Sequence, residues 1–111
     1  MTEHVVVIGS GFGGLASALR ARKMGFNVTV VERLEQLGGR AQTFERDGFV
    51  FDAGPTVITA PFLFEELFQL FGRKIEDYVE ILPVSPWYRY EFQDGSHLNY
   101  GGSVDDTLKE I

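Results

Sequence analysis

The sequence lacks cysteine, has few basic side chains and contains no long apolar run. The absence of cysteine excludes disulfides, zinc-thiolate sites and cysteine nucleophiles within these 111 residues. Ten basic residues stand against sixteen acidic ones, and the net charge of -6 argues against a non-specific nucleic-acid binder, which needs a basic surface. No stretch approaches the ~20 apolar residues of a membrane helix, and residues 1–4 carry no secretory signal. We therefore expect a cytoplasmic protein, for which attachment to a membrane surface stays open.

The first thirty residues predict a βαβ unit. Residues 5–8 are apolar and β-branched, as is typical of a strand buried on both faces. A glycine-rich turn and a helix over residues 15–24 follow, and Gly25 stands where a left-handed C-cap is common. A second apolar strand over residues 28–31 completes the unit, so the two strands should be parallel.

The remaining sequence predicts short elements separated by turns. Asp47-Gly48 signals a type I′ hairpin, and Pro61 opens a helix that should end near Gly72. Further strands are expected at residues 79–82, 87–92 and 97–100, and Ser103 is expected to cap a last helix. Because that helix has barely begun where the sequence stops, we expect the chain to be the first piece of a longer protein.

Three glycines form the pattern G-x-G-x-x-G between the first strand and the first helix. Gly9 allows a tight turn, Gly11 lets the backbone approach a pyrophosphate, and Gly14 lets helix and strand pack closely. Glu32 follows the second strand, where a carboxylate accepts hydrogen bonds from the hydroxyls of an adenosine ribose and repels a 2′-phosphate. These features predict a ligand with an ADP moiety, either NAD or FAD. The alternative is a glycine turn that only packs a helix on a sheet.

A second glycine turn favours FAD over NAD. Gly38 and Gly39 follow Glu32 closely, and Arg40 offers a planar set of donors for a phosphate or a flavin-side oxygen. An NAD site built on the first βαβ unit does not need this turn. The alternative interpretation is an ordinary loop with Arg40 as a surface charge.

Several segments resemble a known family. Glu32-Arg33 followed by Gly38-Gly39-Arg40 resembles the start of the glutathione-reductase-type FAD domain shared by amine oxidases and carotenoid desaturases. Residues 48–59 and 78–84 closely resemble bacterial-type phytoene desaturases, and the likeness runs across nearly the whole chain. The difference is length, because members of that family are several times longer.

The resemblance implies a fold and a site. It implies an α/β protein, with a Rossmann-like FAD-binding βαβ unit over residues 1–58 and the start of an α+β substrate domain over residues 59–111, which is truncated. It implies that FAD is held by Gly9, Gly11, Phe12, Gly14, Glu32, Arg33, Gly39 and Arg40, while Gly54, Pro55 and Thr56 pass near the flavin ring. From the residues alone, Gly54-Pro55 is equally well a turn that ends a strand. We assign no catalytic residue and no metal site.

The implied activity is FAD-dependent desaturation of a C40 carotenoid, from phytoene toward neurosporene or lycopene. The alternatives are another FAD oxidoreductase of the same fold (a carotenoid isomerase or ketolase, a retinol saturase or an amine oxidase) and a non-catalytic dinucleotide-binding fragment. An apolar polyene substrate implies peripheral contact with a membrane. The phenylalanine-rich residues 62–71 either pack against other parts of the protein, line a site for this substrate or face the membrane. The number of desaturation steps, the electron acceptor and the oligomeric state stay open.

Overall fold

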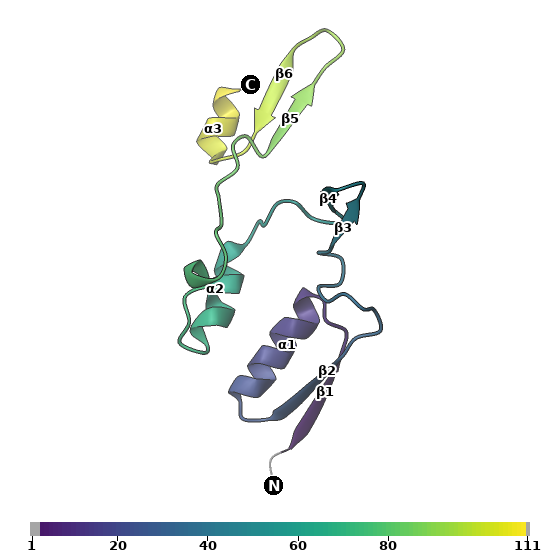
Figure 1. The fold of residues 1–111 in the computed structure, drawn as a ribbon. Helices are drawn as coiled ribbons and strands as arrows, with labels where there is room; N and C mark the ends of the chain where they lie inside the picture. Colours follow the sequence, from purple (N-terminus) through teal and green to yellow (C-terminus); the bar gives the residue numbers. More distant parts are fainter. Residues whose placement is uncertain (1–2, 111) are drawn as a thin grey trace. The chain divides into compact units, whose positions relative to one another are not determined.

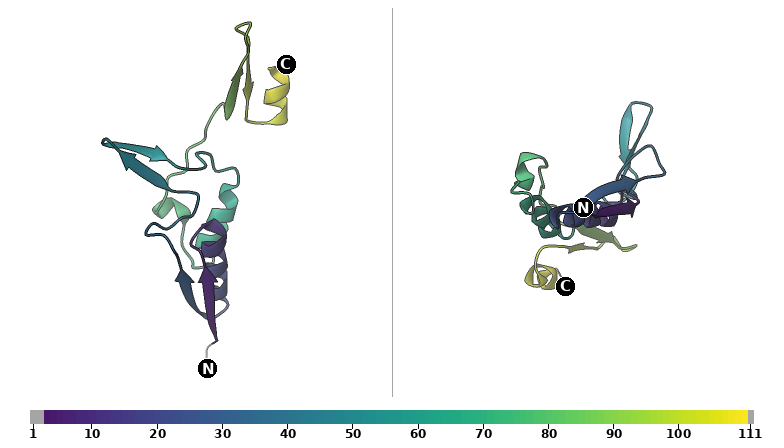
Figure 2. Two further views of the ribbon diagram at one scale, coloured as in Figure 1. Left: turned by 90° about the vertical axis from the view of Figure 1, so that its right-hand side faces the viewer. Right: turned by 90° about the horizontal axis from the view of Figure 1, so that it is seen from below.

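A βαβ unit opens the chain, as predicted. The computed structural model describes residues 3–110, which form two compact units divided between Glu80 and Ile81. In the first unit β1 (His4–Ile8) and β2 (Asn27–Val31) pair in parallel, with Val5 opposite Val28 and Ile8 opposite Val31. The connecting helix α1 (Phe12–Lys23) lies along one face of this pair (Figures 1 and 2).

The prediction that residues 5–8 form a strand buried on both faces is wrong for this structure. Burial alternates along β1, with Val5 and Val7 half-buried and Val6 and Ile8 58% and 88% exposed. The reason is that α1 covers only one face of the strand pair. The other face of β1 and β2 carries apolar side chains without a covering element among the described residues.

Helix α1 begins three residues earlier than expected. Its first turn contains Phe12, Gly13 and Gly14, which the sequence had placed in the preceding loop. Glycine can adopt helical dihedral angles at a small cost in backbone entropy, and the N–H groups of the first helical residues need no acceptor within the helix. The C-terminal end is as predicted, because Gly25 takes a φ of 100° and the N–H of Phe26 bonds to the carbonyl of Ala21.

The predicted hairpin follows. Strands β3 (Thr43–Arg46) and β4 (Phe49–Asp52) are antiparallel, and Asp47 and Gly48 between them both have positive φ, at 55° and 80°, as a type I′ turn requires. Phe44 and Phe51 lie directly opposite each other and their rings stack with centroids 5.2 Å apart.

Helix α2 (Pro61–Gln69) carries proline in its first turn and ends in a turn at Gly72, whose φ of 66° permits the predicted stop. It is followed by a 3-10 turn, η1 (Ile75–Asp77). The predicted strand over residues 79–82 is not formed. The N–H of Val79 bonds back to the carbonyl of Ile75, and Pro83 and Pro86 further along have no N–H to offer a neighbouring strand.

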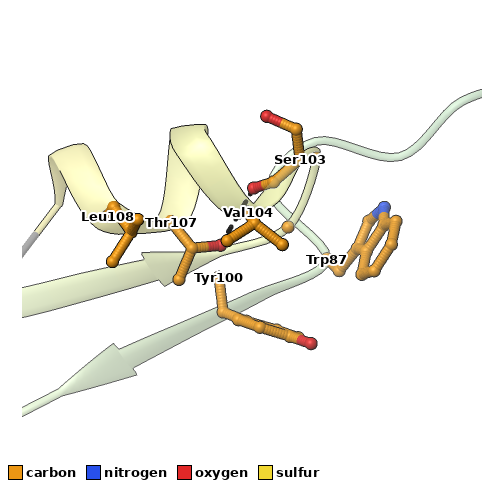
Figure 3. Close-up of a pocket in the computed structure, with 8 residues that line it drawn as sticks. Trp87, Tyr100, Ser103, Val104, Thr107 and Leu108 are labelled. Atoms are coloured by element: carbon orange, nitrogen blue, oxygen red, sulfur yellow. Dashed lines mark hydrogen bonds between the residues drawn. The ribbon is translucent and has the colours of Figure 1, made fainter.

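The second unit is a hairpin with a short helix. Strand β5 (Tyr88–Glu91) is shorter than the predicted 87–92, and it pairs with β6 (His97–Tyr100) in antiparallel fashion. Ser103 is the N-cap of helix α3 (Val104–Lys109), as predicted, and it forms a capping box with Asp106. A shallow pocket of about 290 Å³ lies between Trp87, Tyr100 and the start of α3 (Figure 3).

The structure bears on the predicted domain boundary and on the question of a membrane-spanning helix. The border between Glu80 and Ile81 divides the chain into two compact units and says nothing about which residues bind cofactor or substrate. The boundary expected between the FAD-binding part and the substrate domain, at residues 58 and 59, therefore stays a prediction. Within residues 3–110 no helix has both the length and the apolar composition that crossing a membrane demands.

Candidate functional site

The N-terminus of α1 is open to a ligand. Gly11 occupies the N-cap position, and no side chain caps the helix. The first N–H groups of a helix have no partner within it, and they carry a partial positive charge. An end of this kind, without a capping carboxylate or hydroxyl, is suited to a phosphate.

The glycines around this helix end are required by the geometry. Gly9 has a φ of 97°, a backbone conformation that residues with a side chain rarely adopt. Its N–H donates a hydrogen bond to the carbonyl of Val31 on the neighbouring strand at 2.7 Å. A Cβ at Gly14 would overlap the carbonyl oxygen of Gly9. Gly14 therefore lets the helix start directly against the end of β1, in the role that the sequence assigned to it.

The carboxylate of Glu32 lies beside the glycine turn. Glu32 directly follows β2, and the parallel register that sets Ile8 opposite Val31 brings it next to Ser10. One carboxylate oxygen accepts hydrogen bonds from the N–H of Ser10 at 2.8 Å and from its hydroxyl at 2.7 Å. The other accepts from the N–H groups of Arg33 at 2.8 Å and Leu34 at 3.0 Å.

These donors keep Glu32 ionised. Led by the hydroxyl of Ser10, with the N–H groups of Leu34 and Ser10 next, they lower the pKa of Glu32 from 4.5 to about 2. The side chain is half-buried, so it stays within reach of a ligand. A fixed anion at this position accepts hydroxyl donors and repels a phosphate.

The second glycine turn packs directly on the first. The N–H of Gly38 bonds to the carbonyl of Ser10 at 3.1 Å, and Gly38 forms an isolated parallel bridge with Gly11. Gly39 has a φ of 64°, and a Cβ there would lie 2.9 Å from the Cα of Gly11. The two turns therefore form one glycine-lined surface beside the N-terminus of α1.

The backbone at Gly54 packs against Arg40, at the end of the second glycine turn. A Cβ at Gly54 would overlap the carbonyl oxygen of Arg40, so this glycine allows two backbone segments to meet. Pro55 lines the groove described below, and Thr56 is exposed. The contact of Gly54, Pro55 and Thr56 with a flavin ring stays a prediction.

Three other predicted site residues contribute in different ways. The ring of Phe12 contacts Phe64 of α2 edge-on with centroids 5.1 Å apart, so its side chain turns toward α2 while its backbone belongs to the first turn of α1. Arg33 offers its N–H to Glu32, and its side chain is exposed. Arg40 is also exposed, at the end of the second glycine turn.

An apolar groove of about 650 Å³ adjoins this region. It lies between α1 and α2, which are also joined by an ion pair between Arg20 and Glu66 at 2.9 Å. Its walls are almost entirely hydrocarbon and include Phe12, Leu15, Leu19, Pro55, Ile58, Leu63, Phe64, Leu67 and Phe68. Four residues of the phenylalanine-rich segment 62–71 thus line this groove, namely Leu63, Phe64, Leu67 and Phe68, whereas Phe62 is 63% exposed.

Sequence reasoning missed Ser10, which is fully buried and bonds to Glu32 through both its N–H and its hydroxyl. It also missed the N–H of Leu34 as a partner of the same carboxylate. The sequence does show a hydroxyl-bearing residue between two glycines of the motif. That its hydroxyl bonds to Glu32 follows only from the register of β1 and β2.

Four features define a dinucleotide-binding protein of the Rossmann type: a parallel βαβ unit, an uncapped helix N-terminus, a glycine turn and an acidic residue after the second strand. The sequence model of the family described as NAD(P)-binding Rossmann-like domain matches residues 7–73. The chain belongs to this family.

Curated relatives add sequence similarity over most of the chain. A lycopene-forming phytoene desaturase of Pantoea ananas is 52% identical over 88% of this chain, and a zeta-carotene-forming phytoene desaturase of Myxococcus xanthus is 45% identical over 98%. A 4,4′-diapolycopene oxygenase of a Methylomonas species is 38% identical over 98%. These matches cover 20%, 21% and 22% of the relatives, so the chain spans about a fifth of their length.

Proposed function

We propose that this chain is the dinucleotide-binding part of an FAD-dependent carotenoid desaturase, which acts on phytoene and forms neurosporene or lycopene. The observation that carries the proposal is the carboxylate of Glu32, held at the glycine turn that starts α1. The 52% identity to a phytoene desaturase supports the choice of reaction.

The residues present fit an ADP moiety. The uncapped N-terminus of α1 suits the pyrophosphate, and at Gly11 no side chain fills the space before it. The half-buried carboxylate of Glu32 suits the two ribose hydroxyls. Each group of the site thus has a counterpart in adenosine diphosphate.

The roles of the chain's own residues follow from this fit. The N–H groups at the start of α1 bind the pyrophosphate, and Glu32 orients the ribose by accepting its hydroxyl protons in hydrogen bonds. Gly39 and Gly11 keep the surface between the two turns free of side chains. When bound, FAD supplies the oxidising chemistry that removes hydrogen from a C–C single bond. We assign proton transfer to none of the residues that the structure describes.

We prefer FAD to the other dinucleotides for two reasons. Glu32 would repel the 2′-phosphate of NADP, because its low pKa keeps it charged at neutral pH. The second glycine turn packs on Gly11 and extends the ligand surface beyond the first βαβ unit, which an NAD site does not need. Arg40 stands at the end of that turn, and its exposed guanidinium offers a planar set of donors that suits a phosphate or a flavin-side oxygen.

The substrate and its location form the next part of the proposal. An apolar C40 polyene partitions into lipid, so we propose a cytoplasmic protein bound peripherally to a membrane. Supporting features are the hydrocarbon groove between α1 and α2 and the exposed side chains Phe62 and Leu63. Flotation of the natural gene product with phospholipid vesicles tests this part, and a protein that stays in the dense fraction would contradict it.

The second candidate function is oxygenation of a carotenoid end group. The 38% identity to a 4,4′-diapolycopene oxygenase over nearly the whole chain favours it over the remaining alternatives. Identity to the two desaturases is higher, which is why desaturation is the first choice.

One experiment distinguishes these functions. The natural gene product is expressed in cells that supply phytoene and, in a second strain, in cells that supply lycopene. We expect coloured polyenes with additional double bonds from phytoene and no change in lycopene, together with flavin absorbance of the purified protein. Oxygenated lycopene would favour the oxygenase. Colourless cells that contain folded, flavin-loaded protein would contradict both carotenoid functions.

A further inference from the structure

Ser10 is the most deeply buried polar residue of the site, with an exposed fraction of 0%. Its three polar groups all have partners. The N–H and the hydroxyl donate to one oxygen of Glu32, and the carbonyl accepts the N–H of Gly38 at 3.1 Å. Ser10 thereby joins the first glycine turn, the end of β2 and the second glycine turn.

The two oxygens of Glu32 have different surroundings. Oε2 is held by Ser10 on the buried side, whereas Oε1 accepts from the N–H groups of Arg33 and Leu34, two exposed residues. Water can take over as acceptor for exposed N–H groups, but it cannot reach a fully buried hydroxyl. A ligand hydroxyl can therefore displace the donors on Oε1 at little cost, and Oε2 stays attached to Ser10.

We propose that Ser10 is the positioning residue for ribose recognition, because its hydroxyl anchors one oxygen of Glu32 so that the other is presented to the adenosine ribose. This inference rests on the proposed dinucleotide binding. Ser10 touches no ligand atom in this arrangement and acts through Glu32 alone.

A double-mutant cycle on the flavin-free natural gene product tests the proposal, with ADP binding measured by titration calorimetry. We expect Ser10→Ala to weaken ADP binding about tenfold, the effect of one hydrogen bond to a charged group. In a Glu32→Ala background the same substitution should change the affinity less than about twofold, because the group through which Ser10 acts is gone.

A matched variant separates anchoring from packing. Ser10→Cys keeps the bulk of the side chain but replaces the hydroxyl by a weak donor. We expect Ser10→Cys to weaken ADP binding as Ser10→Ala does. Binding of 2′,3′-dideoxy-ADP, which has no ribose hydroxyls, should be nearly the same in wild type and both variants. Ser10→Cys also keeps the test decisive if the alanine variant folds poorly.

The outcomes are distinguishable. If Ser10→Cys binds ADP as wild type does, or if Ser10→Ala loses equal affinity with and without Glu32, Ser10 only fills space and the proposal is overturned. If wild type itself binds no ADP, the proposed dinucleotide function fails and this inference fails with it. Normal wild-type binding with no loss in either variant overturns the inference alone.

Discussion

The carboxylate of Glu32 accepts hydrogen bonds from both the N–H and the hydroxyl of Ser10, at 2.8 and 2.7 Å, across a sequence separation of 22 residues. This contact connects the turn after β1 to the end of β2, at the place where α1 begins. The turn after β1 thus both leads into the uncapped N-terminus of α1 and holds the carboxylate that we propose for ribose binding.

Reversing the charge at Glu32 should remove FAD from the protein. Glu32→Arg takes away the acceptor for the ribose hydroxyls and places a cation among four N–H and O–H donors. We expect the purified variant to lack flavin absorbance. The matched control is Glu35→Arg, an equal charge change at an exposed position three residues later, which should keep its flavin. Normal flavin content in Glu32→Arg would show that Glu32 is not the ribose ligand.

Acid sensitivity should depend on Glu32. Its pKa is about 2 in the folded chain against an ordinary value of 4.5, so folding favours the ionised form. The stability that this adds is complete above pH 4.5 and is lost as the pH falls toward 2. Asp106, whose hydrogen bond from the Ser103 hydroxyl lowers its pKa to about 2, contributes in the same range.

The contribution of Glu32 to the free energy of unfolding is therefore measured as the difference between wild type and a Glu32 variant. Urea unfolding of flavin-free wild type and Glu32→Gln is compared between pH 2 and pH 7. The stability gap should be widest above pH 4.5 and narrow on acidification. A gap that does not change with pH would mean that the pKa of Glu32 is not lowered by folding.

Two neighbouring glycines in α1 should respond to alanine with opposite signs. At Gly13 a Cβ meets nothing within 4 Å, so Gly13→Ala should stabilise the flavin-free protein by about 0.5–1 kcal/mol through helix propensity. At Gly14 a Cβ would overlap the carbonyl oxygen of Gly9, so Gly14→Ala should destabilise it by roughly 1–3 kcal/mol. Urea unfolding measures the stability of both variants. Equal changes in stability would contradict the close approach of Gly14 to the carbonyl of Gly9.

The second glycine turn should matter through its contact with the first. Gly39 and Gly48 both have positive φ, at 64° and 80°, so alanine at either position costs about 1–2 kcal/mol of backbone strain. Only Gly39 faces a neighbour, the Cα of Gly11 at 2.9 Å from a Cβ. We expect Gly39→Ala to lose most of its flavin and Gly48→Ala to retain it. Equal flavin content in the two variants would contradict a shared ligand surface.

Residues 1–111 produced alone should self-associate. Ile8 is 88% exposed, Val6 58% and Phe62 63%, and β1 and β2 form a sheet of only two strands with unpaired edges. Size-exclusion chromatography should show species larger than a monomer with little bound flavin. A monodisperse, flavin-loaded monomer would show that these residues suffice as an FAD-binding unit.

Local patterns determined most of the elements. The β-branched residues of β1 and β2, the glycines that end α1 and α2, the Asp47-Gly48 turn and the Ser103 cap all act within a few residues of their own position, so sequence reasoning located them. The predicted strand at residues 79–82 failed because strand formation needs a partner, and a run of apolar residues does not provide one. The start of α1 was placed late because glycine at a helix start resembles glycine in a loop.

The motif G-x-G-x-x-G with Glu32 was sufficient by itself to predict a dinucleotide site, since each residue type has a separate chemical reason to be there. The sequence could not show that Ser10 bonds to Glu32, that Gly39 packs on Gly11 or that Gly54 meets the backbone of Arg40. These relationships join residues that are far apart in the chain. They exist only after parallel pairing of β1 and β2 sets the register and brings the ends of both strands, with the loops that follow them, to one edge of the sheet.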